Sequence, residues 1–492
     1  MWPFGSRTKA ARSLPATLGE VFPRLRARYD AAVTTVDNAR HWQHADGLSA
    51  DAAASTEVRR TLRNRSRYEV ANNAYAKGII LTLANDVVGT GPRLQLLSED
   101  AEANRMIEQA FAEWATEIDL AQKLRTMRMA KATDGEVFAV LIDNRGLRSH
   151  GTLDVSVVEA DRVSTPLSKL SSPGVVDGIE LDKSGNPRRY FILDGHPGGD
   201  GLVETLTDEH RPYPADAVIH WFRPDRPGQH RGVPEITPAL PLFAQLRRYT
   251  LAVLAAAETA ADFAAVLYTD APANGEAASV EPMDVVSLEK RMATTLPDGW
   301  KLGQIRAEQP GTTYAEFKRE LLNEIARCLN MPFNVAAGNS SGYNYASGRL
   351  DHQTYFKSIR VDQAACNAVV LDRIFAAWIA ELAVRGDLPY LKGQPIPPHQ
   401  WFWDGVEHVD PAKEAGAQST RLSSHTTTLA AEYARQGKDW ETELRQRAKE
   451  RELMKELGLA AEQAAPAPSE PDEPDDTEVD PSDDDKDVKQ AA

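Results

Sequence analysis

Cysteine is the scarcest reactive residue in this sequence: two, Cys328 and Cys366, occur in 492 residues. Two thiols are too few for a disulfide framework or a cysteine-based zinc site, which excludes the small secreted scaffolds stabilised by either device. Both cysteines lie in helical patterns, so we expect buried, inert thiols. A reducing cytoplasm fits this composition best.

Long hydrophobic runs are also missing. The most apolar stretch, residues 249–268, is interrupted by Glu258 and Asp262, whereas a membrane-spanning helix needs ~20 residues with few or no charges. The opening "MWPFGSRTKA" has no apolar core of the length that a secretory signal requires. We therefore expect a soluble protein with no membrane partner.

The common nucleotide-binding and hydrolase motifs are absent. No G-x-x-x-x-G-K-[ST] string occurs, and "GTGPRL" (89–94) follows a helical pattern and lacks the third glycine of a dinucleotide fingerprint. The nucleophile-elbow pattern G-x-S-x-G is missing as well. We therefore expect no enzymatic activity and no cofactor.

Two short acidic strings, "DGE" (134–136) and "EAD" (159–161), leave one enzymatic alternative open. Their carboxylates could hold the ions of a two-metal nuclease. The simpler interpretation is that the first string starts a strand and the second ends one, so we expect no metal site. The carboxylates concerned are those of Asp134, Glu136, Glu159 and Asp161.

The net charge of −16 is unevenly distributed. Residues 470–489 hold eleven acidic residues and two lysines, a charge of −9 that leaves −7 for the rest. Together with several prolines this predicts a disordered, solvated tail. By contrast, "RRTLRNRSR" (59–67) carries five arginines, which indicates a solvated helix or a subunit contact, with contact to phosphates as the alternative.

The hydrophobic period predicts an α+β protein in which helices dominate. Val/Ile/Phe-rich runs with a period near two indicate a β-rich module over residues 136–222, followed by a Pro/Gly-rich connector at 223–238. Helical periodicity indicates helices at 66–94, at a segment with Ile107, Phe111 and Trp114 on one face, at 239–268, 312–332 and 349–384, and twice more before the acidic tail.

The stretch "AAGNSSGYNYASGR" (336–349) separates two of these helices. Its Gly, Asn and Ser residues favour a loop, because Gly tolerates positive φ and the other two bond their own backbone. It contains no nucleophile beside a base and no metal-ligand set. We interpret it as a flexible finger with polar and aromatic tips.

Several strings, taken in order, resemble the lambda-like family of portal proteins of tailed bacteriophages. They are "NNAYAKGIILTLANDVVGTGPRLQ" (72–95), "DGEVF" (134–138), "VVEADRVSTP" (157–166), "GVVDGIELDKSGNPRRYFIL" (174–193), "AVIHWFRPDRPGQHRGVP" (217–234), "GYNYASGRL" (342–350), "DPAKEAGA" (410–417) and "ARQGKDWE…LGL" (434–459). The family's loop commonly reads Tyr-Ser-Ser-x-Arg, and the segment from Tyr345 to Arg349 has Ala in place of one Ser.

The resemblance implies a portal fold with named parts. Residues 1–60 would form a partly disordered arm, 61–238 the wing, 239–268 the first stem helix, 269–311 the clip, 312–332 the second stem helix, 333–348 the tunnel loop, 349–404 a long channel or wing helix with its connector, 405–460 the crown helices, and 461–492 the acidic tail. The DNA channel would be lined by Asn339, Ser340, Ser341, Tyr343, Asn344, Tyr345, Ser347 and Arg349. Structural family positions would be Gly228, Gln229, Arg231, Gly232, Asp410, Pro411 and Lys413.

The resemblance also implies a function and partners. Such a protein forms a ring, usually of twelve copies, at one capsid vertex, and double-stranded DNA passes through it without sequence readout. It would dock the terminase large subunit, which holds the ATPase site, the capsid or scaffold protein, and the head-completion or tail adaptor proteins. We expect it in the virion, and in the host cytoplasm during assembly. The alternatives are another head–tail connector and the metal-dependent DNA nuclease.

Overall fold

The computed structural model describes residues 35–36, 38–199, 209–262, 266–269, 300–303, 313–342, 344–386, 396–405 and 411–459. The chain divides into two compact units, one of residues 1–91 and 99–398 and the other of 92–98 and 399–492. The acidic tail 461–492 lies outside the described residues. Among the helices described, none combines the length and apolar character needed to cross a bilayer.

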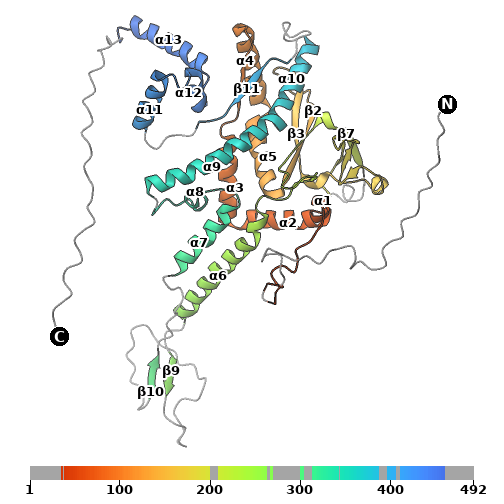
Figure 1. The fold of residues 1–492 in the computed structure, drawn as a ribbon, viewed down its shortest axis with the longest axis vertical. Helices are drawn as coiled ribbons and strands as arrows, with labels where there is room; N and C mark the ends of the chain where they lie inside the picture. The colour runs from red at the N-terminus through yellow and green to blue at the C-terminus, as the bar shows by residue number, and fades with distance from the viewer. Residues whose placement is uncertain are drawn as a thin grey trace, which may run out of the picture. The chain divides into compact units, whose positions relative to one another are not determined.

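The first unit starts with helices arranged around α3 (Ala74–Val88), whose apolar face is buried. Helix α3 contacts α2, α5, α8 and α9 (Figure 1). The early helices are α1 (Ala50–Ala53), α2 (Thr56–Asn72), α4 (Ala101–Glu117) and α5 (Leu120–Asp134). Helix α3 therefore forms the centre of this helical layer.

The helix expected over residues 66–94 is in fact two helices that meet at Asn73. This residue ends α2 with an extended backbone and also caps α3, where its side-chain oxygen accepts hydrogen bonds from the Tyr75 and Ala76 amides at 3.1 and 3.5 Å. Asn is a strong N-cap because its oxygen satisfies amides that have no partner within the helix. Helix α3 ends at Val88 and is followed by Gly89 as its C-cap.

The amphipathic helix predicted around Ile107, Phe111 and Trp114 is confirmed as α4, and all three side chains are buried. Its aromatic rings pack against α10 (Asp372–Arg385). The ring centroids of Phe111 and Trp378 lie 5.3 Å apart in an edge-on arrangement that the ring quadrupoles favour. The Trp114 indole donates to the Leu153 carbonyl at 2.8 Å, which ties α4 to the β-rich module.

The β-rich module predicted over 136–222 consists of two antiparallel sheets. The first has the order β3-β2-β8, and the second has the order β4-β5-β6-β7. The strands are β2 (Glu136–Asp143), β3 (Leu153–Val158), β4 (Val175–Val176), β5 (Ile179–Leu181), β6 (Pro187–Leu193), β7 (His210–Pro214) and β8 (Val218–Phe222). Short 3₁₀ turns span Ala160–Arg162, Leu167–Lys169, Ala215–Ala217 and Thr237–Ala239.

Both sheets contribute to one apolar core, in which Phe138 and Val140 of β2 lie with Ile179, Tyr190 and Ile192 of the second sheet. A turn at residues 183–186 joins β5 to β6. Its backbone is held by the preceding carboxylate, that of Asp182, which accepts from the amides of residues 184 and 186 at 2.8 Å each. The core thus fixes β2, whose first residue is Glu136.

The long helix expected at 239–268 is shorter than predicted. Helix α6 covers Leu240–Asp262, and the following Val266–Thr269 is strand β9. Strand β9 pairs antiparallel with β10 (Trp300–Gly303). Strand β10 lies within the segment expected as the clip, residues 269–311, whereas β9 lies at the end of the expected stem helix. The Ala-rich composition extended the helical period past its end because Val266, Leu267 and Tyr268 fit either structure, and pairing with β10 decided between them.

The helix–loop–helix segment also differs from the prediction. Helix α7 covers Thr313–Arg327 rather than 312–332, and a short helix, α8 (Phe333–Ala337), occupies part of the expected loop. Helix α9 already begins at Tyr345 and runs to Cys366. A π-helical turn at Asn367–Leu371 joins α9 to α10, so the predicted helix of 349–384 is a continuous helix with an irregular middle.

The second unit brings an early segment of the chain together with the C-terminal residues. Strand β1 (Arg93–Leu96) pairs antiparallel with β11 (His399–Phe402). Three helices follow where two were expected: α11 (Pro411–Ser423), α12 (Leu429–Arg435) and α13 (Trp440–Glu456). Residues 92–98 and 399–404, which the sequence grouped with the wing and the channel helix, therefore belong to the unit of the predicted crown helices.

Candidate functional site

The expected channel loop is a short segment, residues 338–344, between α8 and α9. Gly338 ends α8 in the left-handed conformation with φ of 62°, which Gly adopts without strain. The Asn339 side-chain oxygen then accepts from the amide and the hydroxyl of Ser341 at 2.9 and 2.7 Å. The loop is thus shaped by its own Gly and Asn chemistry, as the composition predicted.

The predicted channel residues fall into three groups. Asn339, Ser340, Ser341, Asn344 and Arg349 are exposed. Tyr345 and Ser347 belong to the first turn of α9, and Tyr343 lies outside the described residues. Contact of these residues with DNA remains a prediction.

The elements on both sides of the loop are anchored in the helical layer. In α8, the Asn334 amide contacts the His352 ring of α9 at 3.0 Å. Further along α9, the Tyr355 hydroxyl donates to Asp86 of α3 at 2.6 Å, and Gln363 donates to the Val87 carbonyl at 3.0 Å. An exposed loop therefore starts and ends on well-held helices, which is the arrangement of a positioned binding loop.

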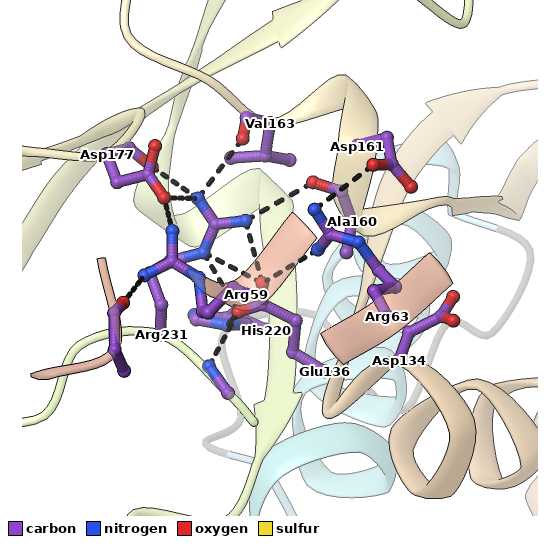
Figure 2. Close-up of polar contacts among 12 residues, drawn as sticks. Arg59, Arg63, Asp134, Glu136, Ala160, Asp161, Val163, Asp177, His220 and Arg231 are labelled. Atoms are coloured by element: carbon purple, nitrogen blue, oxygen red, sulfur yellow. Dashed lines mark hydrogen bonds and ion pairs between the residues drawn. The ribbon is translucent and has the colours of Figure 1, made fainter. Parts of the chain in front are cut away.

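The arginine run of α2 occupies a different environment from the one expected. Arg59 and Arg63 are only 4% and 5% exposed. Figure 2 shows their side chains among carboxylates of β2 and of the 160–177 segment. The expectation of a solvated helix, a subunit contact or a phosphate contact is wrong for these two residues, because they form ion pairs inside the first unit.

Glu136 is the centre of this arginine–carboxylate cluster. Its side chain is fully buried, and both of its oxygens accept from the Arg231 guanidinium at 2.7 to 3.0 Å. The His220 ring contacts it at 3.0 Å, and the Gly232 amide donates at 2.9 Å. Arg63 lies 3.8 Å away (Figure 2). A buried carboxylate needs such partners because burial alone costs several kcal/mol.

The remaining acidic residues of the two strings are also engaged. Asp134 accepts a two-pronged pair of hydrogen bonds from Arg67 at 2.7 and 2.8 Å. Asp161 lies 3.1 Å from Arg63 and 2.8 Å from Arg67. Glu159, by contrast, is 59% exposed and lies 3.1 Å from the His196 ring.

A metal site is not assembled from these carboxylates. Within the described ranges, no three His, Cys, Asp or Glu residues are grouped so that they could hold a metal ion. The positive charges that neutralise Asp134, Glu136 and Asp161 come from arginine side chains. The arrangement supports the structural interpretation of the "DGE" and "EAD" strings over the nuclease alternative.

The "GQHRG" connector contributes to the same cluster. The Gln229 side chain accepts from the Asp225 amide at 2.9 Å and donates to the Arg231 carbonyl at 2.8 Å, which directs Arg231 inward. Gly228 adopts a positive φ of 76°. Gly232 packs directly on Gly135: a Cβ on Gly232 would lie 2.1 Å from the Gly135 oxygen. The connector residues Gly228, Gln229 and Gly232 therefore place the guanidinium of Arg231 beside Glu136.

The cluster stabilises the charged form of Glu136 more than it stabilises the charged forms of Arg59 and Arg63. Burial alone would raise the pKa of Glu136, but Arg231 and His220 outweigh it and hold the pKa far below its ordinary value. Burial lowers the pKa of Arg59 to about 10, with Arg231 adding to the effect, and burial also lowers the pKa of Arg63. Burial lowers the pKa of His220, which is therefore neutral near pH 7. The cluster thus combines a strongly held carboxylate with arginines whose charges are less well compensated.

A second buried cluster links α5, the connector and α9. Arg128 and Lys131 of α5 pair with Glu235 at 3.0 and 3.3 Å and with Asp362 of α9. Lys131 also lies 4.9 Å from the centre of the Trp221 ring. Burial raises the pKa of Glu235, but Arg128 and Lys131 outweigh it and bring it to about 2. This cluster fixes α9, the helix that follows the loop at residues 338–344, to α5 and the connector, and Lys131 extends the contact to β8 of the β-rich module.

The last predicted family positions lie at the start of α11. Pro411 begins this helix and Lys413 is exposed on it, whereas Asp410 lies outside the described residues. The structural role expected for these positions stays a prediction.

With this geometry in hand, the chain can be compared with known proteins. Residues 37–363 match the family described as phage portal protein, lambda family. The chain belongs to this family. The resemblance inferred from the ordered strings is thereby confirmed, and the function is that of a portal protein.

The chain is also similar to individual proteins. A probable portal protein of Halomonas phage phiHAP-1 is 26% identical over 459 residues, which cover 88% of this chain and 87% of the relative. Among solved structures, the neck of an empty gene transfer agent particle is 14% identical, with a TM-score of 0.45, and covers 75% of this chain and 91% of that one. A portal protein of the HK97 family from Corynebacterium diphtheriae is 14% identical, with a TM-score of 0.29, and covers 71% and 96%.

The sequence missed the buried clusters of this portal protein. One signal was available: Arg59, Arg63 and Arg67 are spaced four residues apart, which places them on one face of α2. A face of arginines opposite buried carboxylates cannot be recognised from one strand or helix alone. Arg231, in a Pro/Gly-rich connector, gave no periodic signal at all.

Proposed function

We propose that copies of this portal protein assemble into a ring, of twelve subunits, at one capsid vertex, where double-stranded DNA enters and leaves the particle. The family match over residues 37–363 carries this proposal, because it includes the arginine–carboxylate cluster and the loop between α8 and α9. In the ring, the loop residues would face the DNA. The protein would act in the virion and assemble in the host cytoplasm.

The parts proposed for this role follow the described elements. Residues 61–91 and 99–238 would serve as the wing, α6 and α7 as stem helices, the segment with β9 and β10 as the clip, and α11–α13 as the crown. The clip would meet the terminase large subunit during packaging and the head-completion or tail adaptor proteins afterwards. The capsid or scaffold protein would surround the ring.

The chemistry of the loop supports passage of DNA without sequence readout. Exposed Asn and Ser side chains make neutral hydrogen bonds to phosphates, which position DNA without reading bases. The chain is acidic, with a net charge of −16, and an acidic surface repels the phosphate backbone and so favours sliding over tight binding. The protein itself would hydrolyse nothing, in line with its missing nucleotide motifs.

The ring is tested by measuring the mass of the purified protein with negative-stain images of the same fractions. Twelve chains of 54.1 kDa give about 649 kDa, and we expect rings with a central hole at that mass. A protein that remains monomeric even when its capsid and scaffold proteins are co-expressed would contradict the ring.

The loop is tested by placing positive charge in it. Asn344→Lys combined with Tyr345→Lys should leave rings intact but lower the DNA packaged per particle, because lysines hold phosphates that must slide past. Thr61→Lys together with Asn72→Lys adds the same charge at exposed positions of α2 and should package normally. Normal packaging by the loop variant would argue against a channel role.

The nuclease alternative has its own test. The protein with Mg²⁺ or Mn²⁺ should leave plasmid DNA uncut. Cleavage that disappears in Glu136→Gln but persists in Glu57→Gln, a change at an exposed site, would favour the nuclease instead.

A further inference from the structure

Helix α9 carries a stripe of positive charge on its exposed side. Arg349, Lys357 and Arg360 are all exposed, and at about 100° per residue they lie within about 80° of one another around the helix axis. The acidic residues of this helix, Asp351 and Asp362, lie more than about 100° away from the three cations. Among the described residues, none of the three has an ion-pair partner. We call these three residues the basic stripe.

Exposed apolar side chains accompany the basic stripe. Leu350 and Val361 are each 66% exposed, and each directly follows an arginine of the stripe in the sequence. They are eleven residues apart, which is close to three helical turns, so they lie on the same side of α9. Apolar contacts bordered by charged side chains are the usual composition of a protein–protein interface.

Helix α7 shows the opposite charge in the same arrangement. Glu316, Glu320 and Glu324 are exposed at a spacing of four residues, and Phe317, 51% exposed, lies beside them. Glu320 lies 3.3 Å from Arg319, which is also exposed, whereas the other two glutamates have no ion pair within the described part of the chain. We call the three glutamates the acidic stripe.

The two stripes match in charge and in length. At about 1.5 Å per residue, the basic stripe is about 16 Å long and the acidic stripe about 12 Å. Arg327 continues the acidic side of α7, where it donates to Asn330 at 3.0 Å. Like charges one turn apart are unfavourable in a helix on its own, so each stripe gains from a partner of opposite sign. In the described residues the two stripes of one chain form no ion pair with each other.

We propose that α9 of one copy of this chain packs against α7 of a second copy. Leu350 and Val361 would contact Phe317, and the basic stripe would face the acidic stripe. The two surfaces differ, so each copy offers α9 to one neighbour and α7 to the other, and such contacts close into a ring when the rotation between copies permits. DNA as the partner would account for the basic stripe alone, whereas a second copy accounts for both stripes. The inference rests on the proposed ring and names its contact surfaces.

The test reverses the charge of each stripe separately. The α9 variant carries Lys357→Glu and Arg360→Glu, and the α7 variant carries Glu320→Lys and Glu324→Lys. Each is produced together with the capsid and scaffold proteins, and the mass of the assembled species is measured by light scattering. We expect the fraction of chains in rings to fall about tenfold or more in each variant, because like charges then face each other across the contact.

An equal mixture of the two variants should form rings again. In the mixture, each acidic α9 meets a basic α7, and each basic α9 meets an acidic α7. A variant with Arg145→Glu and Lys183→Glu, two exposed positions in turns, changes the net charge as much as the α9 variant does and should assemble like the wild type. Circular dichroism should be the same for all, because the changed helix positions are exposed and Glu, Lys and Arg are all good helix formers.

The outcomes separate this contact from the ring itself. Rings in the wild type and in both variants would overturn the contact and leave the ring intact. An α9 variant that forms rings but packages less DNA would assign the basic stripe to DNA, and a mixture that fails to restore rings would also overturn the contact. A wild type that stays monomeric under these conditions would overturn the ring and this contact together.

Discussion

The arginine–carboxylate cluster and the loop at residues 338–344 are both polar, yet they differ in what surrounds them. Arg231 and Glu136 are excluded from water and meet at 2.7 Å, whereas Asn339 and Ser341 bond each other in the open. In the cluster, removing one partner leaves a buried charge uncompensated. In the loop, water replaces any lost partner. Stability should therefore depend on the cluster and function on the loop.

The largest effect is expected for Glu136→Gln. This change leaves Arg231 and Arg63 beside a neutral amide in a fully buried site, so the free energy of unfolding should fall by about 3–5 kcal/mol. Guanidinium-induced unfolding measures it. Glu159→Gln, at an exposed carboxylate, should stay within about 0.5 kcal/mol. Similar losses in both variants would erase the distinction between buried and exposed carboxylates.

The second cluster should make stability depend on acid. The folded pKa of Glu235 is about 2, below its ordinary 4.5, so its ionised form stabilises the fold above pH 4.5. That stabilisation is lost as the pH falls from 4.5 towards 2, by on the order of 3 kcal/mol.

The measurement compares unfolding of the wild type and Glu235→Gln across this pH range. The difference between them should be largest above pH 4.5 and shrink towards pH 2. Glu57→Gln, at an exposed carboxylate, should show no such trend. A difference that stays constant down to pH 2 would contradict the assignment.

A smaller loss is expected where two backbones touch. In Gly232→Ala the new Cβ would lie 2.1 Å from the Gly135 oxygen, so the connector must shift, at a cost of about 1–3 kcal/mol in unfolding free energy. Gly78→Ala is the opposite case: its Cβ meets nothing within 4 Å on helix α3, and it should stabilise by about 0.5–1 kcal/mol. A neutral Gly232→Ala would show that the connector can adjust.

The smallest effect on stability is expected in the loop. Asn339→Ala removes the two hydrogen bonds to Ser341, but the site is exposed. The free energy of unfolding, measured by guanidinium-induced unfolding, should therefore change by no more than about 0.5 kcal/mol. A loss as large as that of a cluster variant would mean that the loop is part of the folded core.

Sequence periodicity identified the elements that carry a regular apolar pattern within one segment of the chain. The face of α4 with Phe111 and Trp114, and the β-rich module, were predictable because each repeats an apolar pattern along one segment. Element ends were harder to predict. Residues 266–269 continued an Ala-rich helical pattern, and only pairing with β10, more than thirty residues later in the chain, made them a strand.

The chemistry of the clusters was the least predictable part. Arg59 and Arg63 read as surface residues because their carboxylate partners lie on other segments. The partner of Glu136 sits in a loop-like connector 95 residues away. Such pairs exist only once the sheets and α2 have come together, so no local pattern can reveal them. The exposed loop, by contrast, was recognisable because its Gly and Asn residues act on their own backbone.

The π-helical turn at Asn367–Leu371 bears on how this chain is aligned with its relatives. A π turn bonds each amide to a carbonyl five residues back, so it holds one residue more than an α-turn. The buried positions Cys366, Val370, Ile374 and Trp378 accordingly recur every four residues without drifting off the core face. A relative that lacks one residue here can form an uninterrupted α-helix with the same face buried, because the deletion removes the π turn and leaves the helical phase unchanged. A single-residue gap at this point in an alignment is therefore compatible with the same packing on both sides of it.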